Sequence, residues 1–384
     1  MKALHLILFP VFIVVCCGCI YPYEPQSVNE IENLLVVDGD IIANGTTIVK
    51  LTRSYKLSYS AETTIPIERN ARVVVESSTG VVYPADETSP GCYEAATDGL
   101  DLSARYRLHI TTRDNMEYAS QFVPVSISPP IDSLSWVVNQ GGKCVNIYVS
   151  THDPTDKTHY YRWNYVQIWE FTSEYYAMIT FDRETGEYVD FPNSISPYYY
   201  CWIEQNSSAI LLDKTSMLSQ SVINNKKLIT IDEEDQRISL LYSVQVIQRA
   251  LTADGYAYWE NLYKNGQDLG GIFAPMPTEQ RGNIYCLSQP KQIVLGFISA
   301  TTLTYSDRIF IERPFRLPIN WICQRGAGEI QYDRGLLIAM FPHYLPVAMV
   351  SPFQRRAIWA QRVCVDCTVK GTKNKPLWWP NDHQ

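Results

Sequence analysis

Short stretches of alternating apolar and polar residues dominate the first third of the chain and predict β-strands. Residues 46–55 alternate as a half-buried strand does, and Asn44-Gly45 directly before them is a typical hairpin turn. Further strand-like stretches follow at close spacing, joined by polar turns: residues 34–42, 71–77, 81–83, 91–95, 106–112 and 118–125. This pattern predicts an all-β sandwich over residues 34–128. Residues 19–33, which precede it, show no clear periodicity and read as an extended tether.

Ser128-Pro129-Pro130 marks the expected domain boundary, because adjacent prolines cannot take part in a regular strand ladder. Beyond it, residues 131–384 again show mostly strand patterns, with the longest at 160–169 and 238–249. We therefore expect a second, larger β-rich domain over residues 131–384 that includes the cysteine-containing tail.

One helix stands out in this second region. Thr252 can cap its N-terminus, Asp254 lies in the first turn, and Lys264 lies in the last turn, where positive charge is favourable. The predicted fold class is thus mainly β, an N-terminal β-sandwich plus a larger β-rich domain with one clear helix.

Aromatic residues crowd both faces of the strand at 160–169, and more follow near residue 200. They suit a platform that stacks sugars or a surface that contacts a partner protein, but core and sheet-edge packing explains the same alternation. The candidate contact residues are Trp163, Tyr165, Trp169, Tyr199 and Trp202.

Composition and charge exclude some classes of partner. The chain has 384 residues, of which 40 are acidic and 32 basic, and 46% are hydrophobic. A net charge of −8 suits neither nucleic acid nor an anionic membrane surface. The hydrophobic and aromatic content is that of a folded protein with about two domains.

The N-terminus has the layout of an export signal over residues 1–18. Lys2 is followed by an almost wholly apolar run over residues 3–15 and then by Cys16-Cys17-Gly18-Cys19. The run is too short to span a membrane, which takes roughly 20 residues. The glycine before Cys19 resembles the lipobox of bacterial lipoproteins, so Cys19 is the expected lipid attachment site. The alternative is an ordinary secretory signal with incidental cysteines.

Seven cysteines follow the signal and its terminal Cys19, and an exported protein meets an oxidising compartment, where disulfides form. Cys364 and Cys367 are compatible with a disulfide set, half a zinc site or a redox pair. No second C-x-x-C or H-x₃₋₅-H motif completes a zinc site, and no helix follows to activate a redox thiol. We expect two disulfides among Cys201, Cys323, Cys364 and Cys367, with the pairing open, and a free thiol among Cys92, Cys144 and Cys286. Neither a metal nor a cofactor is expected.

Several short motifs along the chain, taken together, resemble the DUF4249 lipoproteins of Bacteroidota. They are Ile131-Asp132-Ser133-Leu134, Cys201-Trp202, Gly270-Gly271-Ile272-Phe273 with Pro275 and Pro277, Gly282-Asn283-Ile284, Val294-Leu295-Gly296-Phe297 and Cys364-Val365-Asp366-Cys367. The resemblance implies an N-terminal sandwich similar to transthyretin-like or carboxypeptidase-regulatory domains. It also implies a cell-envelope lipoprotein associated with a TonB-dependent outer-membrane transporter. The sequence departs from the usual lipobox at Cys16.

The expected function is that of an outer-membrane lipoprotein, a non-enzymatic accessory of such a transporter that assists nutrient capture or uptake. The alternatives are a surface module that binds polymers and an envelope hydrolase whose acids the sequence does not reveal. The chain contains no nucleophile elbow, phosphate-binding loop or dinucleotide fingerprint. Glu24 is the only acid soon after Cys19, whereas a signal for export to the cell surface usually contains more acids. The sequence therefore does not decide whether the protein faces the medium or the periplasm.

Overall fold

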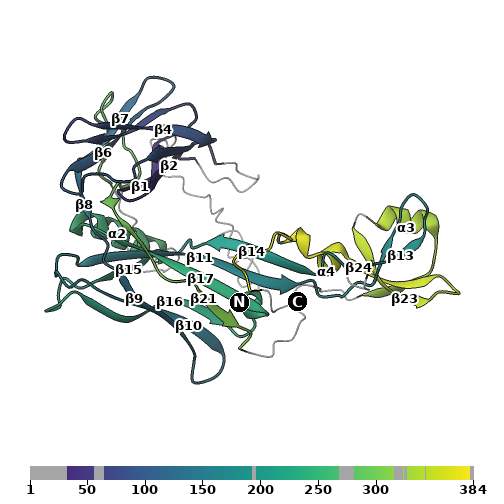
Figure 1. Cartoon of the computed structure of the whole chain (residues 1–384). Coiled ribbons are helices and arrows are strands. Elements are labelled where there is room, and N and C mark those ends of the chain that lie inside the picture. The colour runs from purple at the N-terminus through teal and green to yellow at the C-terminus, as the bar shows by residue number, and fades with distance from the viewer. Residues whose placement is uncertain are drawn as a thin grey trace, which may run out of the picture.

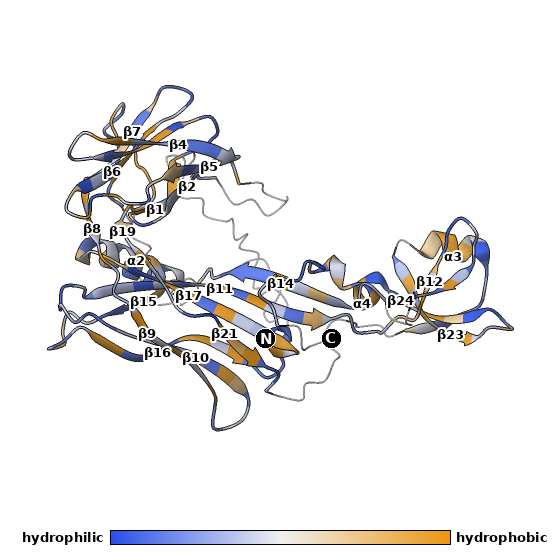
Figure 2. Cartoon of the chain, in the orientation of Figure 1, coloured by the Kyte–Doolittle hydropathy of each residue, from blue (hydrophilic) through white to orange (hydrophobic). Residues whose placement is uncertain are grey.

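The computed structural model describes residues 33–55, 65–192, 196–267, 281–314, 323, 327–341 and 343–380. The predicted signal over 1–18, Cys19, the tether up to residue 32 and the motif at 270–277 lie outside the described residues. The described chain is mainly β, as predicted, and forms three lobes in a bent row (Figure 1). Apolar and polar segments alternate along the strands, so each sheet turns one face to a core (Figure 2).

The N-terminal lobe is one sheet that closes on itself. Its strand order is β18-β7-β6-β3-β4-β5-β2-β1-β19-β8, and β6 also pairs with β8, which makes the sheet barrel-like. Leu35, Leu51, Tyr93 and Leu108 are almost fully buried within it. The strands from the first part of the chain are β1 (Leu35–Ile42), β2 (Thr46–Arg53), β3 (Arg72–Ser77), β4 (Val82–Ser89), β5 (Cys92–Ala96), β6 (Arg105–Thr111), β7 (Glu117–Ser120) and β8 (Val123–Ser126).

Two strands of this lobe come from much later in the chain. β18 (Ile284–Cys286) pairs with β7, and β19 (Ala300–Thr301) lies parallel between β1 and β8. Ile298 and Ala300 are buried in the N-terminal core. The expectation that residues 131–384 form a separate second domain is therefore wrong for this segment, because its apolar residues fill the gap between β1 and β8.

The central lobe is a sandwich of two sheets. One sheet has the order β16-β10-β9; the other has β14-β11-β17-β20, with β15 on β11 and β21 on β17. Val145, Ile147, Trp163 and Tyr242 are buried between them. The elements are β9 (Ile131–Val138), β10 (Cys144–His152), β11 (Tyr160–Thr172), β14 (Tyr200–Asn206), β15 (Leu211–Lys214), β16 (Val222–Asp232), η3 (Gln236–Ile238), β17 (Leu241–Ala250), β20 (Leu303–Tyr305) and β21 (Ile309–Glu312).

The predicted helix is present as α2 (Ala253–Gln267), directly after β17. The Thr252 hydroxyl accepts a hydrogen bond from the Gly255 amide at 3.2 Å, which satisfies one of the free amides of the first turn. The capping residue expected from the sequence thus has that role.

The third lobe combines a hairpin from the middle of the chain with the C-terminal part. Phe181 on the hairpin packs against Phe341 and Trp359 with ring centroids 5.8 and 5.7 Å apart. We call this unit the distal lobe (Figure 1, right). Its elements are β12 (Ile179–Phe181), β13 (Tyr188–Asp190), β22 (Gly328–Ile330), α3 (Arg334–Met340), β23 (Tyr344–Ser351), β24 (Arg356–Gln361), α4 (Arg362–Val365) and η4 (Cys367–Val369).

Candidate functional site

The five aromatic residues expected to form a contact surface are mostly part of the cores. Trp163, Trp169 and Trp202 are 0, 7 and 4% exposed, so for these three the contact prediction is wrong and core packing is correct. Tyr165 and Tyr199 are partly buried. The strand places its tryptophans between two layers, where a large apolar ring gains most from leaving water.

The four cysteines expected to bridge form two disulfides. Cys201 on β14 bonds to Cys367, and Cys323 bonds to Cys364, each with a Cα–Cα distance of 5.8 Å. The two cysteines of the C-x-x-C motif thus hold different partners rather than each other. The first bridge ties the C-terminal tail to the central lobe, and the second lies within the distal lobe.

The other three cysteines of the described chain are unpaired. Cys92 and Cys144 are partly buried and Cys286 is buried, so three thiols are free where the odd number of cysteines predicted one. The thiols lie in β5, β10 and β18, which are parts of different sheets or opposite regions of one sheet.

Glu174 lies beside the second disulfide. Its carboxylate and the sulfurs of Cys323 and Cys364 lie within 4.8 Å of one another and are the one such group of three potential metal ligands among the described residues. Burial raises the pKa of Glu174. Since both sulfurs are bonded to each other, they are not thiolates and do not offer a metal the ligands it needs.

The acidic loop after β10 is held by its own hydrogen bonds. The Asp153 carboxylate accepts bonds from the amides of Thr155 and Thr158 at 2.9 and 2.8 Å and from the Thr155 hydroxyl at 2.7 Å. Burial alone raises the pKa of Asp153, but these bonds outweigh burial and lower it to about 2. His152 pairs with Asp132 at the exposed edge of the loop. The cluster stabilises the loop and leaves no converging set of free ligands.

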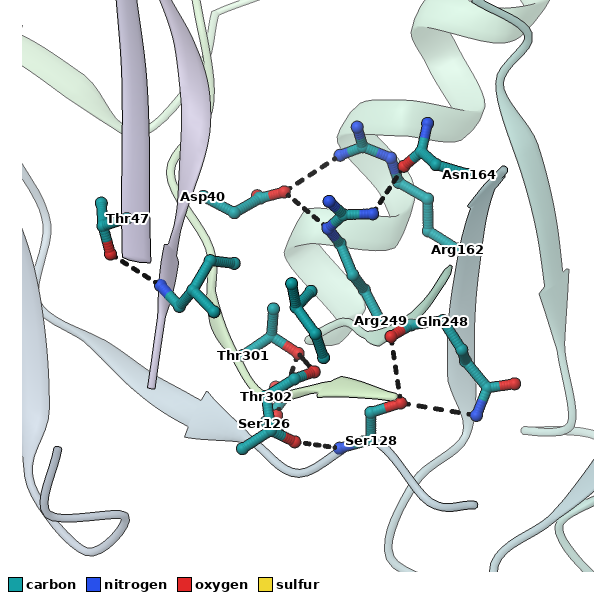
Figure 3. Close-up of polar contacts among 12 residues, drawn as sticks. Asp40, Thr47, Ser126, Ser128, Arg162, Asn164, Gln248, Arg249, Thr301 and Thr302 are labelled. Carbon is teal, nitrogen blue, oxygen red and sulfur yellow. Dashed lines mark hydrogen bonds and ion pairs between the residues drawn. The ribbon is translucent and has the colours of Figure 1, made fainter. Parts of the chain in front are cut away.

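A group of buried polar side chains lies where the N-terminal and central lobes meet (Figure 3). Asp40 on β1 is 8% exposed and forms ion pairs with Arg162 at 3.4 Å and Arg249 at 3.5 Å. Arg249 also donates to the Asn164 side chain at 2.6 Å, and the Arg162 guanidinium lies 3.6 Å from the centroid of the Trp259 ring. We call these residues the junction cluster.

Charge explains why the junction cluster holds the lobes together. Arg162 and Arg249 face each other across the β11–β17 ladder, where two like charges repel. Burial lowers the pKa of Arg162, whereas the nearby Asp40 raises it. The negative charge of Asp40, in the N-terminal lobe, therefore reduces the repulsion between the two arginines of the central lobe, which would otherwise destabilise their sheet.

A second set of contacts fixes the connector between the lobes. The Gln248 side chain is fully buried and donates to the carbonyl of Pro129 at 2.8 Å and to the hydroxyls of Thr151 and Ser128 at 3.2 and 3.4 Å. Its carbonyl accepts the indole N–H of Trp163 at 2.9 Å. The predicted boundary at Ser128-Pro129-Pro130 is thus anchored to the central core and does not act as a free hinge.

Sequence reasoning missed Asp40, Arg162 and Arg249. The one available signal was that Arg162 and Arg249 each lie within a predicted strand. Their common partner, Asp40, lies more than a hundred residues earlier in the sequence. Only the return of the chain to the first lobe brings these three side chains together.

No helix in the described ranges has the length and apolar character needed to cross a membrane.

The sequence model of a protein family, described as a domain of unknown function (DUF4249), matches residues 20–306. The matched span contains the N-terminal lobe and most of the central lobe, and it ends before the C-terminal part of the distal lobe. No curated protein matches the chain.

Proposed function

The chain belongs to the DUF4249 family, and from this premise we propose that it is a lipid-anchored outer-membrane protein that acts as a non-enzymatic accessory of a TonB-dependent transporter. Its role there is to assist the capture or uptake of a nutrient. The membership covers residues 20–306, which include both of the lobes joined by the junction cluster.

Two features of the chain support export and anchoring. The apolar run over residues 3–15 ends in small residues at Gly18, directly before Cys19. The body contains two disulfides, which persist in oxidising compartments such as the bacterial periplasm and the cell surface. A lipobox cysteine carries more than one acyl chain, and dual acylation is enough for stable anchoring, so Cys19 alone would hold the body at the membrane surface.

The observation that carries the accessory role is the set of buried polar contacts at Asp40 and Gln248 that join the N-terminal and central lobes. Buried polar groups at this junction serve to hold one β lobe against the next, and the acidic loop and cysteines stabilise the fold in the same way. Such a scaffold presents fixed surfaces to a partner, which suits recognition. Catalysis instead needs free acids, bases or nucleophiles converging on one point.

Acyl-chain labelling and a mild-detergent pull-down from native membranes test the proposal together. We expect the wild-type protein to incorporate a labelled fatty acid, to fractionate with the outer membrane and to retain a TonB-dependent transporter. Cys19→Ala should abolish labelling and release the protein, whereas Cys17→Ala, which changes a neighbouring thiol, should do neither. Label on the Cys19→Ala protein, or a pull-down without any transporter, would overturn the proposal.

A further inference from the structure

The distal lobe contains a cavity of about 410 Å³. It lies between β12, the residues Phe191, Ser196 and Tyr198, and the β23–α4 region, at the place where the two apolar clusters of this lobe meet. Its apolar wall includes Phe191, Phe341 and the ring of Tyr198, and its polar groups include Arg183, Arg362 and Asp366. The volume lies in the range of about 300–1,000 Å³ that is usual for small-molecule sites.

Among the described residues of the cavity wall, Asp366 is the one acidic group, and its carboxylate is already satisfied. Asp366 is 3% exposed and accepts hydrogen bonds from the Thr368 amide at 3.0 Å, from the Thr368 hydroxyl and from Arg362 Nε at 3.0 Å. The carboxylate thus fixes the Arg362 side chain by its Nε atom. The two terminal nitrogens of Arg362 have no hydrogen-bond partner among the described residues and remain available as a planar pair of donors.

Arg183 supplies a second free cation. It lies in the turn between β12 and β13, it is exposed, and it has no ion pair or hydrogen bond within the described parts of the chain. A third positive group lies near the rim, since Lys373 Nζ is 4.9 Å from the centroid of the Tyr198 ring. The polar part of the cavity therefore has an excess of positive charge beside an aromatic wall.

We propose that this cavity binds a small organic anion, a carboxylate with an apolar or aromatic body. Arginine recognises carboxylates through paired N–H donors, and such charge-assisted bonds are stronger than neutral ones. The rings of Phe191 and Phe341 bury the apolar body, as the walls of ligand sites generally do. The inference names the ligand class for the nutrient capture proposed above and rests on that proposal for its biological purpose.

Calorimetric titration of the full, detergent-solubilised chain tests this directly, with titrations into detergent alone subtracted. The probes are 4-phenylbutyrate and its neutral amide, 4-phenylbutyramide, which differ only in the charged group. We expect the acid to bind about tenfold more tightly than the amide, because only the acid forms charge-assisted bonds. Equal affinity for the two probes, or no binding of the acid at millimolar concentration, would overturn the proposal.

Two substitutions in the same lobe locate the site. Arg183→Gln should weaken 4-phenylbutyrate binding about tenfold and leave the amide unchanged. Arg356→Gln removes the same charge on β24 outside the cavity and should leave both affinities unchanged. If the two variants behave alike, the cavity is not the binding site. Because no transporter takes part, a negative result here leaves the accessory role intact, and failure of the pull-down leaves the binding result intact.

Discussion

Trp202 and Thr372 exchange two backbone hydrogen bonds, with the Trp202 amide donating to Thr372 at 2.8 Å and the Thr372 amide donating to Trp202 at 2.9 Å. The C-terminal tail therefore continues the β14 edge of the central lobe as a short antiparallel bridge. Gly371 permits this approach, because a Cβ atom there would lie 2.7 Å from the Trp202 carbonyl oxygen and 2.8 Å from the Phe171 ring. The C-terminal tail is thus an integral part of the central lobe.

The Cys201–Cys367 disulfide should stabilise this arrangement strongly. It joins residues 166 positions apart, and loss of a cross-link over a long segment increases the entropy of the unfolded chain. We expect the Cys201→Ser/Cys367→Ser variant to lose about 2–4 kcal/mol of unfolding free energy, measured by urea titration with tryptophan fluorescence. Cys92→Ser, which removes an unpaired thiol, is the control and should change little. Equal effects of the two would show that the bridge adds no stability.

Trp379 should be the main apolar anchor of the tail. It is 3% exposed, packs with Phe310 at a centroid distance of 5.8 Å and donates its indole N–H to Glu170 at 3.2 Å. Trp379→Ala should cost about 3–5 kcal/mol, as truncation of a buried aromatic residue does, and should raise the susceptibility of the tail to protease. Leu377→Ala, two residues away at a fully exposed position, should stay within about 0.5 kcal/mol of wild type.

Asp40 should contribute more to the free energy of unfolding than a single surface charge does. Asp40→Ala leaves Arg162 and Arg249 buried and uncompensated, which should cost about 3 kcal/mol or more in thermal or chemical unfolding. It should also loosen the contact between the N-terminal and central lobes, seen as faster hydrogen exchange in β1 and β17. The control is Arg69→Ala, which breaks a 3.9 Å surface pair with Glu87 and should cost less than about 1 kcal/mol. Wild-type exchange in the Asp40→Ala protein would contradict the role of the junction cluster.

Stability should fall in acid as Asp153 becomes protonated. Its pKa is about 2 in the folded chain, below the ordinary value of 3.8, so its hydrogen bonds stabilise the protein fully above pH 3.8. This contribution is lost as the pH falls from about 4 through 2. Asp153→Asn should lower stability at neutral pH and flatten the acid limb of the stability profile. Asp190→Asn, at an exposed position on β13, should leave that limb unchanged.

Local patterns were enough to predict much of the fold. The Asn44-Gly45 turn lies between β1 and β2 as expected, and α2 begins after Thr252. These features depend on neighbouring residues only. The set of four bridging cysteines was also predictable. The partner of each was not, because pairing depends on which distant segments of the chain the fold brings together.

The features that failed depend on contacts between distant segments. The alternation of Trp163 and Trp169 with their neighbours fits an exposed aromatic surface and a covered sheet equally well. These rings are buried because the second sheet of the central lobe packs against them, and that packing cannot be read from the local sequence. Likewise, no local signal marks the two-residue β19 as part of the first lobe. The cavity beside Arg183 is formed by two segments that are far apart in the sequence, one ending at Tyr198 and the other beginning at Phe341, so the sequence alone offered no hint of it.

The insertion of β19 between β1 and β8 has a consequence for biogenesis. A ribosome releases a chain from the N-terminus, so the first seven strands and β8 are available long before residues 300–301. Until then the sheet has a seam with two unpaired strand edges, which are prone to pair with other chains. A nascent chain that stalls before this seam is sealed should be a substrate for holdase chaperones, and a fragment ending near residue 130 should aggregate rather than behave as an autonomous folding unit.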